Sequence, residues 1–166
     1  MASTTRMQRP ATYEDANLIL RLFELRREEK LRQARDWFFK NFKVRNMEEF
    51  GKLCPHGSQE HAYQRMITSY WDMAASFVTS GVLHEELFAQ NSRELLFVWE
   101  RIRDIVPAVR ESYKNPKLSK NLETVAKAMR EIQKPETYAK YSRGVRILRR
   151  LLSPERNAER YLAGIE

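Results

Sequence analysis

Apolar residues recur every three or four positions along most of the chain, a spacing that places them on one face of an α-helix. Thr12 and Ser58, two residues that favour helix N-caps, precede two of these stripes. Gly81 follows the second of them, and glycine closes a helix readily because the left-handed conformation costs it nothing. In the first half of the chain, the pattern therefore predicts helices over 12–38, 46–53 and 58–80.

The segment 81–123 combines a hinge, a long amphipathic stripe and a capped helix start. Pro107 lies inside the stripe and removes one backbone hydrogen bond, so we expect the long helix to be kinked there. Asn115 and Pro116 form an N-cap followed by proline in the first turn, which predicts that the next helix starts at this pair. In this half, helices are expected over 84–89, 95–113, the segment that follows Pro116, and 138–152.

The fold class follows from this periodicity. No segment alternates between apolar and polar residues long enough to indicate a strand. A length of 166 residues is usual for one domain and allows a sizeable core. We therefore expect an all-α fold, a single-domain antiparallel bundle of about five to seven helices. Residues 1–11 are predicted to be a flexible N-terminal tail and 12–166 the helical domain.

Composition places the chain among basic proteins without a membrane span. No apolar run approaches the roughly 20 residues that cross a bilayer, and the N-terminus shows no apolar signal sequence. The single cysteine, Cys54, rules out an intrachain disulfide and favours the cytoplasm. The formal charge of +8 is uneven, because residues 51–100 are net acidic whereas 101–134 are the most basic stretch. This polarity raises the possibility of an anionic partner.

Nucleic-acid binding is an alternative function, through basic faces in 101–134 and 140–150. The second face carries cationic side chains that could follow a phosphate backbone. The simpler interpretation is a core helix whose arginines extend to solvent, and this interpretation is favoured. The candidate nucleic-acid residues are Arg143, Arg146, Arg149 and Arg150.

Metal chemistry is a second alternative. Cys54, His56 and His61 form the one cluster of metal-binding residue types, but their spacing matches no known zinc motif. A buried cysteine, a loop histidine and a first-turn histidine explain the same residues. The chain also lacks nucleotide-binding, nucleophile-elbow and zinc-protease motifs. We therefore predict no cofactor, no metal site and no catalytic residue, although a metal-dependent enzyme stays open as an alternative.

One polar set within 81–123 has no obvious structural role in the sequence pattern. Acid–base catalysis needs two carboxyl groups aimed into one pocket, but here arginines stand among the carboxylates and would neutralise them. The set is consequently a candidate for binding rather than for catalysis. Its members are Glu100, Arg103, Arg110, Asn121 and Glu123.

Several aromatic residues lie away from the main apolar stripes. Phe97 falls off the stripe that contains Trp99, and the adjacent Phe38 and Phe39 point to different helix faces. Such rings indicate a second packing surface and hence an interface. The leading prediction is a non-enzymatic binding or regulatory module that acts through protein–protein contacts, as a homodimer or with another protein.

The segment 81–123 also resembles an uncharacterised bacterial family of small all-helical proteins. The resemblance implies a helical fold and transfers no activity, ligand or catalytic residue. The residues that carry it are Gly81-Val82-Leu83, Glu85-Glu86-Leu87-Phe88, Val98-Trp99-Glu100, Arg110-Glu111, Asn115-Pro116, Leu118 and Asn121-Leu122-Glu123.

Overall fold

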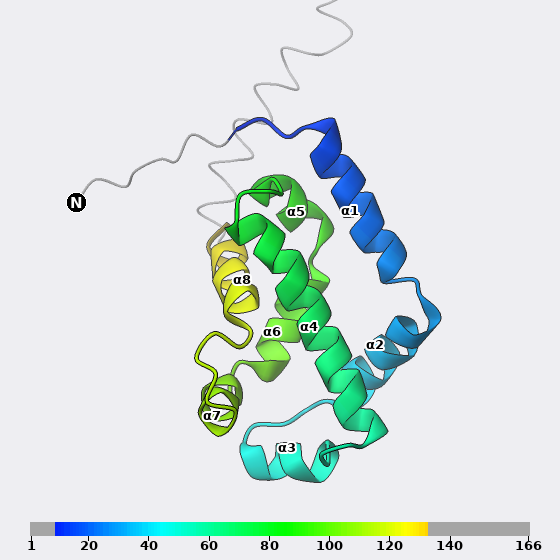
Figure 1. Ribbon diagram of the computed structural model, residues 1–166, viewed down its shortest axis with the longest axis vertical. Coiled ribbons are helices and arrows are strands. Elements are labelled where there is room, and N and C mark those ends of the chain that lie inside the picture. The colour runs from blue at the N-terminus through cyan, green and yellow to red at the C-terminus, as the bar shows by residue number, and fades with distance from the viewer. Residues whose placement is uncertain (1–8, 133–166) are drawn as a thin grey trace, which may run out of the picture. The chain divides into compact units, whose positions relative to one another are not determined.

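The computed structural model describes residues 9–132, and this part of the chain is all-helical, as predicted (Figure 1). It contains eight helices, slightly more than the expected five to seven, because two predicted long helices are each divided. They are α1 (Tyr13–Leu25), α2 (Glu29–Asn41), α3 (Met47–Leu53), α4 (Gln59–Thr79), α5 (Glu85–Asn91), α6 (Glu94–Ile102), α7 (Val106–Ser112) and α8 (Lys120–Ile132).

The core is built around α4, the longest helix, and α2 packs against it more extensively than any other described helix does. Phe38 on α2 and Phe42 just after it are fully buried, and their rings stack with centroids 4.7 Å apart. Trp71 on α4 is buried as well and contacts Phe88 of α5 edge-on. Aromatic burial of this kind supplies a large share of the stability of a small helical unit.

The single helix predicted over 12–38 is wrong, because the chain breaks between α1 and α2. Residues 26–28 form a turn, and the Glu28 carboxylate caps α2 by accepting a hydrogen bond from the Leu31 amide at 2.9 Å. The Arg26 guanidinium lies 5.3 Å from the centre of the Trp71 ring. The charged residues 26–30 therefore contain the end of one helix and the cap of the next.

The kinked helix predicted near Pro107 is also two helices. α6 ends at Ile102, a short turn follows, and Pro107 stands in the first turn of α7. Proline suits this position because the amide that it lacks has no partner in a first turn. The sequence located the interruption correctly, but the helix ends there and a new one begins, so it is not a kink.

The helix expected to start at Asn115-Pro116 starts later, at Lys120. The Asn115 side chain instead accepts a hydrogen bond from the Lys117 amide at 3.0 Å, which closes a turn of the loop. Lys114 and Ser119 both have positive φ, at 49° and 54°, so the chain reverses twice before α8 begins. This loop forms one wall of the cavity described below.

Three other boundaries agree with the sequence. The helix predicted over 46–53 is α3, capped by Asn46, and Ser58 caps α4 as expected. Gly81 has φ +78°, the left-handed conformation that closes α4. Between residues 9 and 132, no helix combines the length and the apolar character that crossing a membrane requires.

Contacts divide the chain between Lys127 and Ala128, and all sites described below belong to the unit that ends at Lys127. The expectation of one domain over 12–166, with a tail over 1–11, includes residues outside the described range and stays a prediction. The helix predicted over 138–152 and the candidate residues Arg143, Arg146, Arg149 and Arg150 also lie outside the described residues.

Candidate functional site

Helix α1 is attached to the rest of its unit through Asp15, whose side chain is buried. Thr12 and Asp15 cap the helix reciprocally, in the capping-box arrangement. The same carboxylate accepts hydrogen bonds from Arg9, at 2.6 and 2.7 Å, and from the His84 amide at the start of α5, at 2.9 Å. The Arg9 hydrogen bonds, followed by those from the Thr12 and His84 amides, hold the pKa of Asp15 far below its usual range.

A second attachment lies near the end of α1. The Tyr70 hydroxyl of α4 donates a hydrogen bond of 2.6 Å to the Leu22 carbonyl. Burial raises the pKa of Tyr70 to about 12, so this donor keeps its proton under ordinary conditions. Polar contacts near both ends thus hold α1 in place, together with the buried Leu22.

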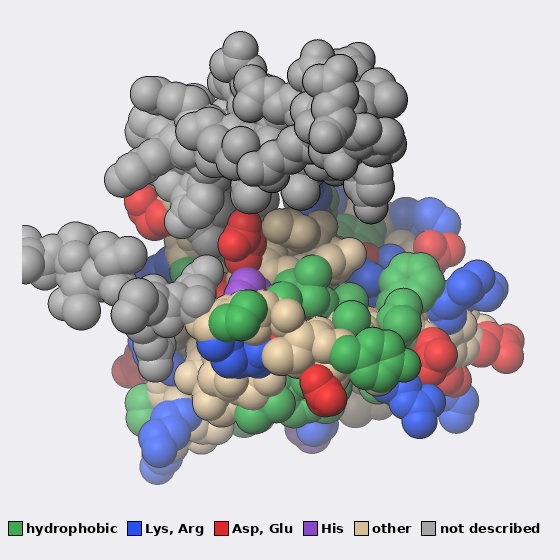
Figure 2. Space-filling model, turned by 90° about the horizontal axis from the view of Figure 1, so that it is seen from above, with side chains coloured by type: hydrophobic (Ala, Val, Ile, Leu, Met, Phe, Trp, Pro, Cys, Tyr) green, Lys and Arg blue, Asp and Glu red, His purple; other side chains and the backbone are tan. Residues whose placement is uncertain are grey.

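Most apolar side chains of α1 face solvent. Of its 13 residues, seven are large and apolar, and only Leu22 among these is buried. Figure 1 shows α1 along an outer edge, and Figure 2 shows hydrophobic side chains gathered over it among charged ones. We call the exposed set the α1 face: Tyr13, Leu20, Phe23 and Leu25 are 77%, 58%, 48% and 52% exposed. An exposed apolar surface of this kind indicates an interaction site.

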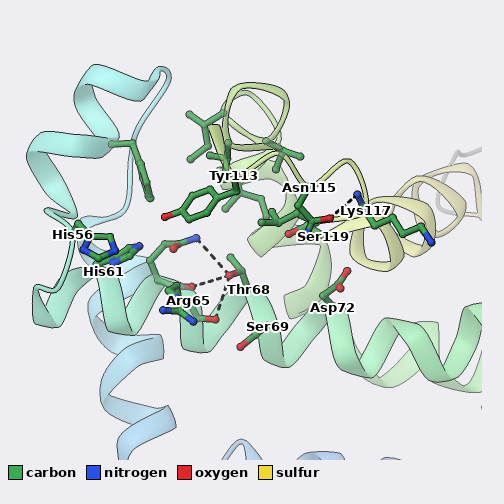
Figure 3. Close-up of a pocket in the computed structure, with 17 residues that line it drawn as sticks. His56, His61, Arg65, Thr68, Ser69, Asp72, Tyr113, Asn115, Lys117 and Ser119 are labelled. Carbon is green, nitrogen blue, oxygen red and sulfur yellow. Dashed lines mark hydrogen bonds between the residues drawn. The ribbon is translucent and has the colours of Figure 1, made fainter. Parts of the chain in front are cut away.

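A cavity of about 480 Å³ lies beside α4, between this helix and the segments that lead to α7 and α8 (Figure 3). It is within the range of pockets that bind small molecules. Hydrophobic side chains from three separate stretches of the chain form its apolar lining: Phe50, Ile102, Ile105, Val106, Val109 and Leu118.

Imidazole and phenol groups mark one end of the cavity. The rings of His56 and His61 lie 5.3 Å apart, and Figure 3 shows the Tyr113 side chain on the opposite wall. His61 is only 7% exposed, and its backbone amide is taken by Ser58, which caps α4. Burial, followed by the charges of His56 and Arg65, lowers the pKa of His61, so its imidazole is neutral near pH 7.

A carboxylate marks the other end of the cavity. Asp72 of α4 accepts a hydrogen bond of 2.9 Å from the Leu122 amide, in the first turn of α8. The hydroxyl-bearing residues Ser69 and Ser119 line the same end. Asp72 therefore has a structural role, since it satisfies one of the free amides at the start of α8.

The family model described as Domain of unknown function (DUF4760) matches residues 11–129. The chain belongs to the DUF4760 family. The segment 81–123, which carried the resemblance, lies inside the matched region, so the predicted family relationship is confirmed, whereas a bacterial origin stays a prediction. Comparison with curated proteins and with solved structures found no match. The DUF4760 description assigns no activity, so the function has to be argued from the geometry.

The polar set predicted within the DUF4760 match falls into local groups. Arg103 contacts Glu100 at 3.1 Å and Asp104 at 3.5 Å, all three being close in sequence. Asn121 accepts a hydrogen bond of 2.8 Å from the Thr79 hydroxyl at the end of α4. Neither group lines the cavity beside α4. These residues stay predictions as binding residues, and their contacts link neighbouring helical segments.

Arg110 and Glu123 form the third group. Arg110 donates to the Leu118 carbonyl at 2.9 Å and to the Glu123 carboxylate at 2.8 Å, which ties α7 to α8 across the intervening loop. Lys120 and Lys127 also contact Glu123, at 3.4 and 2.5 Å. One carboxylate thus contacts three cations of the basic stretch 101–134.

This group predicts a dependence of stability on acid. The hydrogen bond from Lys127, followed by Arg110 and Lys120, lowers the pKa of Glu123 to about 2 from its usual 4.5. A lowered pKa stabilises the folded state above pH 4.5, and that contribution is lost as the pH falls from 4.5 to 2. We expect Glu123→Gln to lower the urea midpoint at pH 7. The difference in midpoint between this variant and wild type should shrink as the pH falls from 4.5 to 2. A constant difference down to pH 2 would contradict this account.

The metal-binding alternative receives little support. His56 and His61 do come together, but no group of three or more histidine, cysteine, aspartate or glutamate side chains that could hold a metal ion occurs within residues 9–132. Cys54 is buried, and burial raises the pKa of its thiol to about 11.

Sequence reasoning missed Asp15 as an anchor and the cavity around His61. The capping pair of Thr12 and Asp15 was readable, since it lies at the start of an apolar stripe. The long-range bond from Asp15 to the His84 amide leaves no local signal. His61 was considered only as a candidate metal ligand, because a position in the first turn of a helix does not reveal what the side chain faces.

Proposed function

We propose that this protein is a non-enzymatic binding module that acts through protein–protein contacts, with a second copy of the chain as its partner on the α1 face. The observation that carries the proposal is the apolar surface of α1. Burying exposed leucine and phenylalanine side chains against a partner is worth roughly 1.5–3 kcal/mol for each one fully buried. That gain is available to the α1 face without loss of the polar bonds that hold α1 in place.

Charge supports a second copy as the occupant. Glu14 lies in the first turn of α1, whereas Arg27 follows its last turn. The Arg27 guanidinium lies 5.5 Å from the centre of the Phe23 ring, beside the α1 face. Two α1 helices packed antiparallel would bring the acidic start of each toward Arg27 of the other and would oppose their helix dipoles.

Nucleic-acid binding through 101–134 draws less support from the contacts. Arg101 donates to the Phe42 carbonyl at 2.7 Å, and Arg103 contacts two carboxylates. Arg110 is tied to Glu123. Cations engaged in this way are less available to phosphates.

A cytoplasmic location belongs to the proposal as well, and the single buried cysteine supports it, because such a thiol suits a reducing compartment.

The test is the mass of the protein in solution across a dilution series, measured by light scattering. We expect twice the subunit mass of 19.8 kDa for wild type and the subunit mass for Leu20→Glu with Phe23→Glu. Both positions are exposed in the isolated chain, so the double variant is expected to keep its helical circular dichroism. Phe97→Glu changes an exposed site on α6 that the sequence also marked as a packing surface, and it should leave the dimer intact. Loss of the dimer in Phe97→Glu, and not in the α1 variant, would contradict the α1 face as the interface. A monomeric wild type would overturn the proposal.

A further inference from the structure

The cavity beside α4 has the composition of a binding site for an amphipathic molecule. Its lining is apolar over Ile105, Val106 and Val109, and polar groups stand at its two ends. Ligand pockets commonly have this character, an apolar wall with a few polar groups that fix orientation. The cavity draws on residues from α4, from α7 and from the loop before α8, and it does not include the α1 face.

His61 places a polar group in the wall of the cavity. The residue is only 7% exposed and lines the cavity, and within residues 9–132 its imidazole nitrogens take part in no hydrogen bond. These nitrogens are not among the side-chain atoms that are sealed from solvent without a partner, so they are open to the cavity. A neutral imidazole can donate one hydrogen bond and accept another. A molecule bound at this end would therefore meet an imidazole that can do both.

The charges near His61 favour an anion. Arg65 also lines the cavity and stands four positions after His61, so the two residues share a face of α4. After burial, the charges of His56 and Arg65 also lower the pKa of His61. The carboxylate that lines the cavity, Asp72, is eleven positions further along α4, roughly 16 Å away at the rise of an α-helix. Glu60 is the neighbour of His61 in sequence, and its charge adds to the effect of burial in raising the pKa of the Cys54 thiol. Tyr113 adds a hydroxyl that can donate to an anion from the opposite wall (Figure 3).

From this arrangement we propose that the cavity binds a carboxylate attached to an apolar body, such as a medium-chain fatty acid or an aryl acid. The carboxylate accepts hydrogen bonds from the His61 imidazole and the Tyr113 hydroxyl, and Arg65 contributes its charge. The apolar body lies against Ile105, Val106 and Val109. This site is separate from the α1 face, so it stands or falls independently of the proposed dimer.

The experiment compares octanoate with 1-octanol, which has the same chain length and no charge. Each is titrated into the isotope-labelled protein, and the backbone amide signals of His61, Val106 and Val109 are followed by NMR. We expect octanoate to bind about tenfold more tightly than octanol, as a hydrogen bond to a charged group predicts. Signals of α1 should not move. Equal affinities, octylammonium binding as tightly as octanoate, or no shifts along the cavity would each overturn the proposal.

Variants assign the contacts. His61→Ala is expected to weaken octanoate binding about tenfold and to leave octanol binding nearly unchanged. If His61→Ala loses its helical circular dichroism, Tyr113→Phe and Arg65→Gln provide the same test, since both residues are exposed. Tyr63→Phe, on α4 outside the lining, and Arg32→Gln, exposed on α2, are the matched controls. Octanoate affinity that is equal in Tyr113→Phe, Arg65→Gln and both controls would overturn the assignment of the carboxylate end.

Discussion

Phe38→Ala is expected to lower the free energy of unfolding by about 3–5 kcal/mol. Phe38 is fully buried, stacks on Phe42 and meets Phe39 edge-on, so removal of its ring leaves a cavity in the contact between α2 and α4. The surrounding helices cannot close such a space without distorting several buried neighbours. Urea unfolding followed by circular dichroism measures the change.

Phe39→Ala is the matched control, because the same ring is removed one position away. Phe39 is only partly buried, so the expected loss is about 1–2 kcal/mol. Phe38→Leu should recover most of the stability, since it keeps an apolar side chain in the space. Equal losses for Phe38→Ala and Phe39→Ala would mean that the α2–α4 contact is not where the core is concentrated.

The second large effect concerns Glu94, at the start of α6. Its carboxylate accepts hydrogen bonds from Arg35 of α2 and, at 3.4 Å, from the Trp71 indole of α4, and Arg26 lies 3.9 Å away. Its side chain is only 13% exposed, so solvent screens these contacts weakly. Glu94→Gln leaves two partly buried guanidinium groups without their anion, and we expect a loss of about 2–4 kcal/mol. Urea unfolding at pH 7 provides the measurement.

Glu48→Gln removes a carboxylate from an ion pair of the opposite kind. Glu48 and Lys52 are 77% and 75% exposed and lie one helical turn apart on α3. The expected loss is below about 0.5 kcal/mol, because water screens the pair. The loss of stability in Glu94→Gln should also depend less on salt concentration than the loss in Glu48→Gln. A Glu94→Gln protein as stable as wild type would contradict a structural role for the network.

Helix ends were predictable wherever a local signal decided them. Ser58 has a hydroxyl that accepts from the His61 amide, and Gly81 adopts positive φ, so both boundaries follow from the residue itself and its immediate neighbours. The apolar spacing was equally reliable for the fold class, because helical periodicity survives any rearrangement of the helices. The family relationship rested on the same segment and extends over 11–129.

The break between α1 and α2 depends on tertiary contacts. The stripe of apolar residues has one gap, between Leu25 and Leu31, and neither glycine nor proline stands in that gap. Arg26 turns toward Trp71 and Glu94, which are distant in sequence, and Glu28 caps the new helix. No window of sequence contains both the cation and its partners, so the periodicity extended the helix too far.

The cavity could not be predicted from the sequence, because it too depends on tertiary contacts. Its lining joins residues from α3, α4, α6 and α7 with the loop before α8. The sequence placed His56 and His61 in one cluster and considered that cluster only as a possible metal site, because metal-ligand motifs are recognised by spacing along the chain. What distinguishes His61 is its position in the wall of the cavity, a property of the packed structure.

The anchors of α1 also constrain the order of events during synthesis. Asp15 bonds to the His84 amide and Arg9 to the Val82 carbonyl, so each bond spans about half of the chain's described length. Helix α1 is synthesised before α5, yet these bonds can close only after residue 84 has emerged, and long loops close slowly. During that interval the nascent chain presents Leu20 and Phe23 to its surroundings, and chaperones that bind apolar segments could bind there.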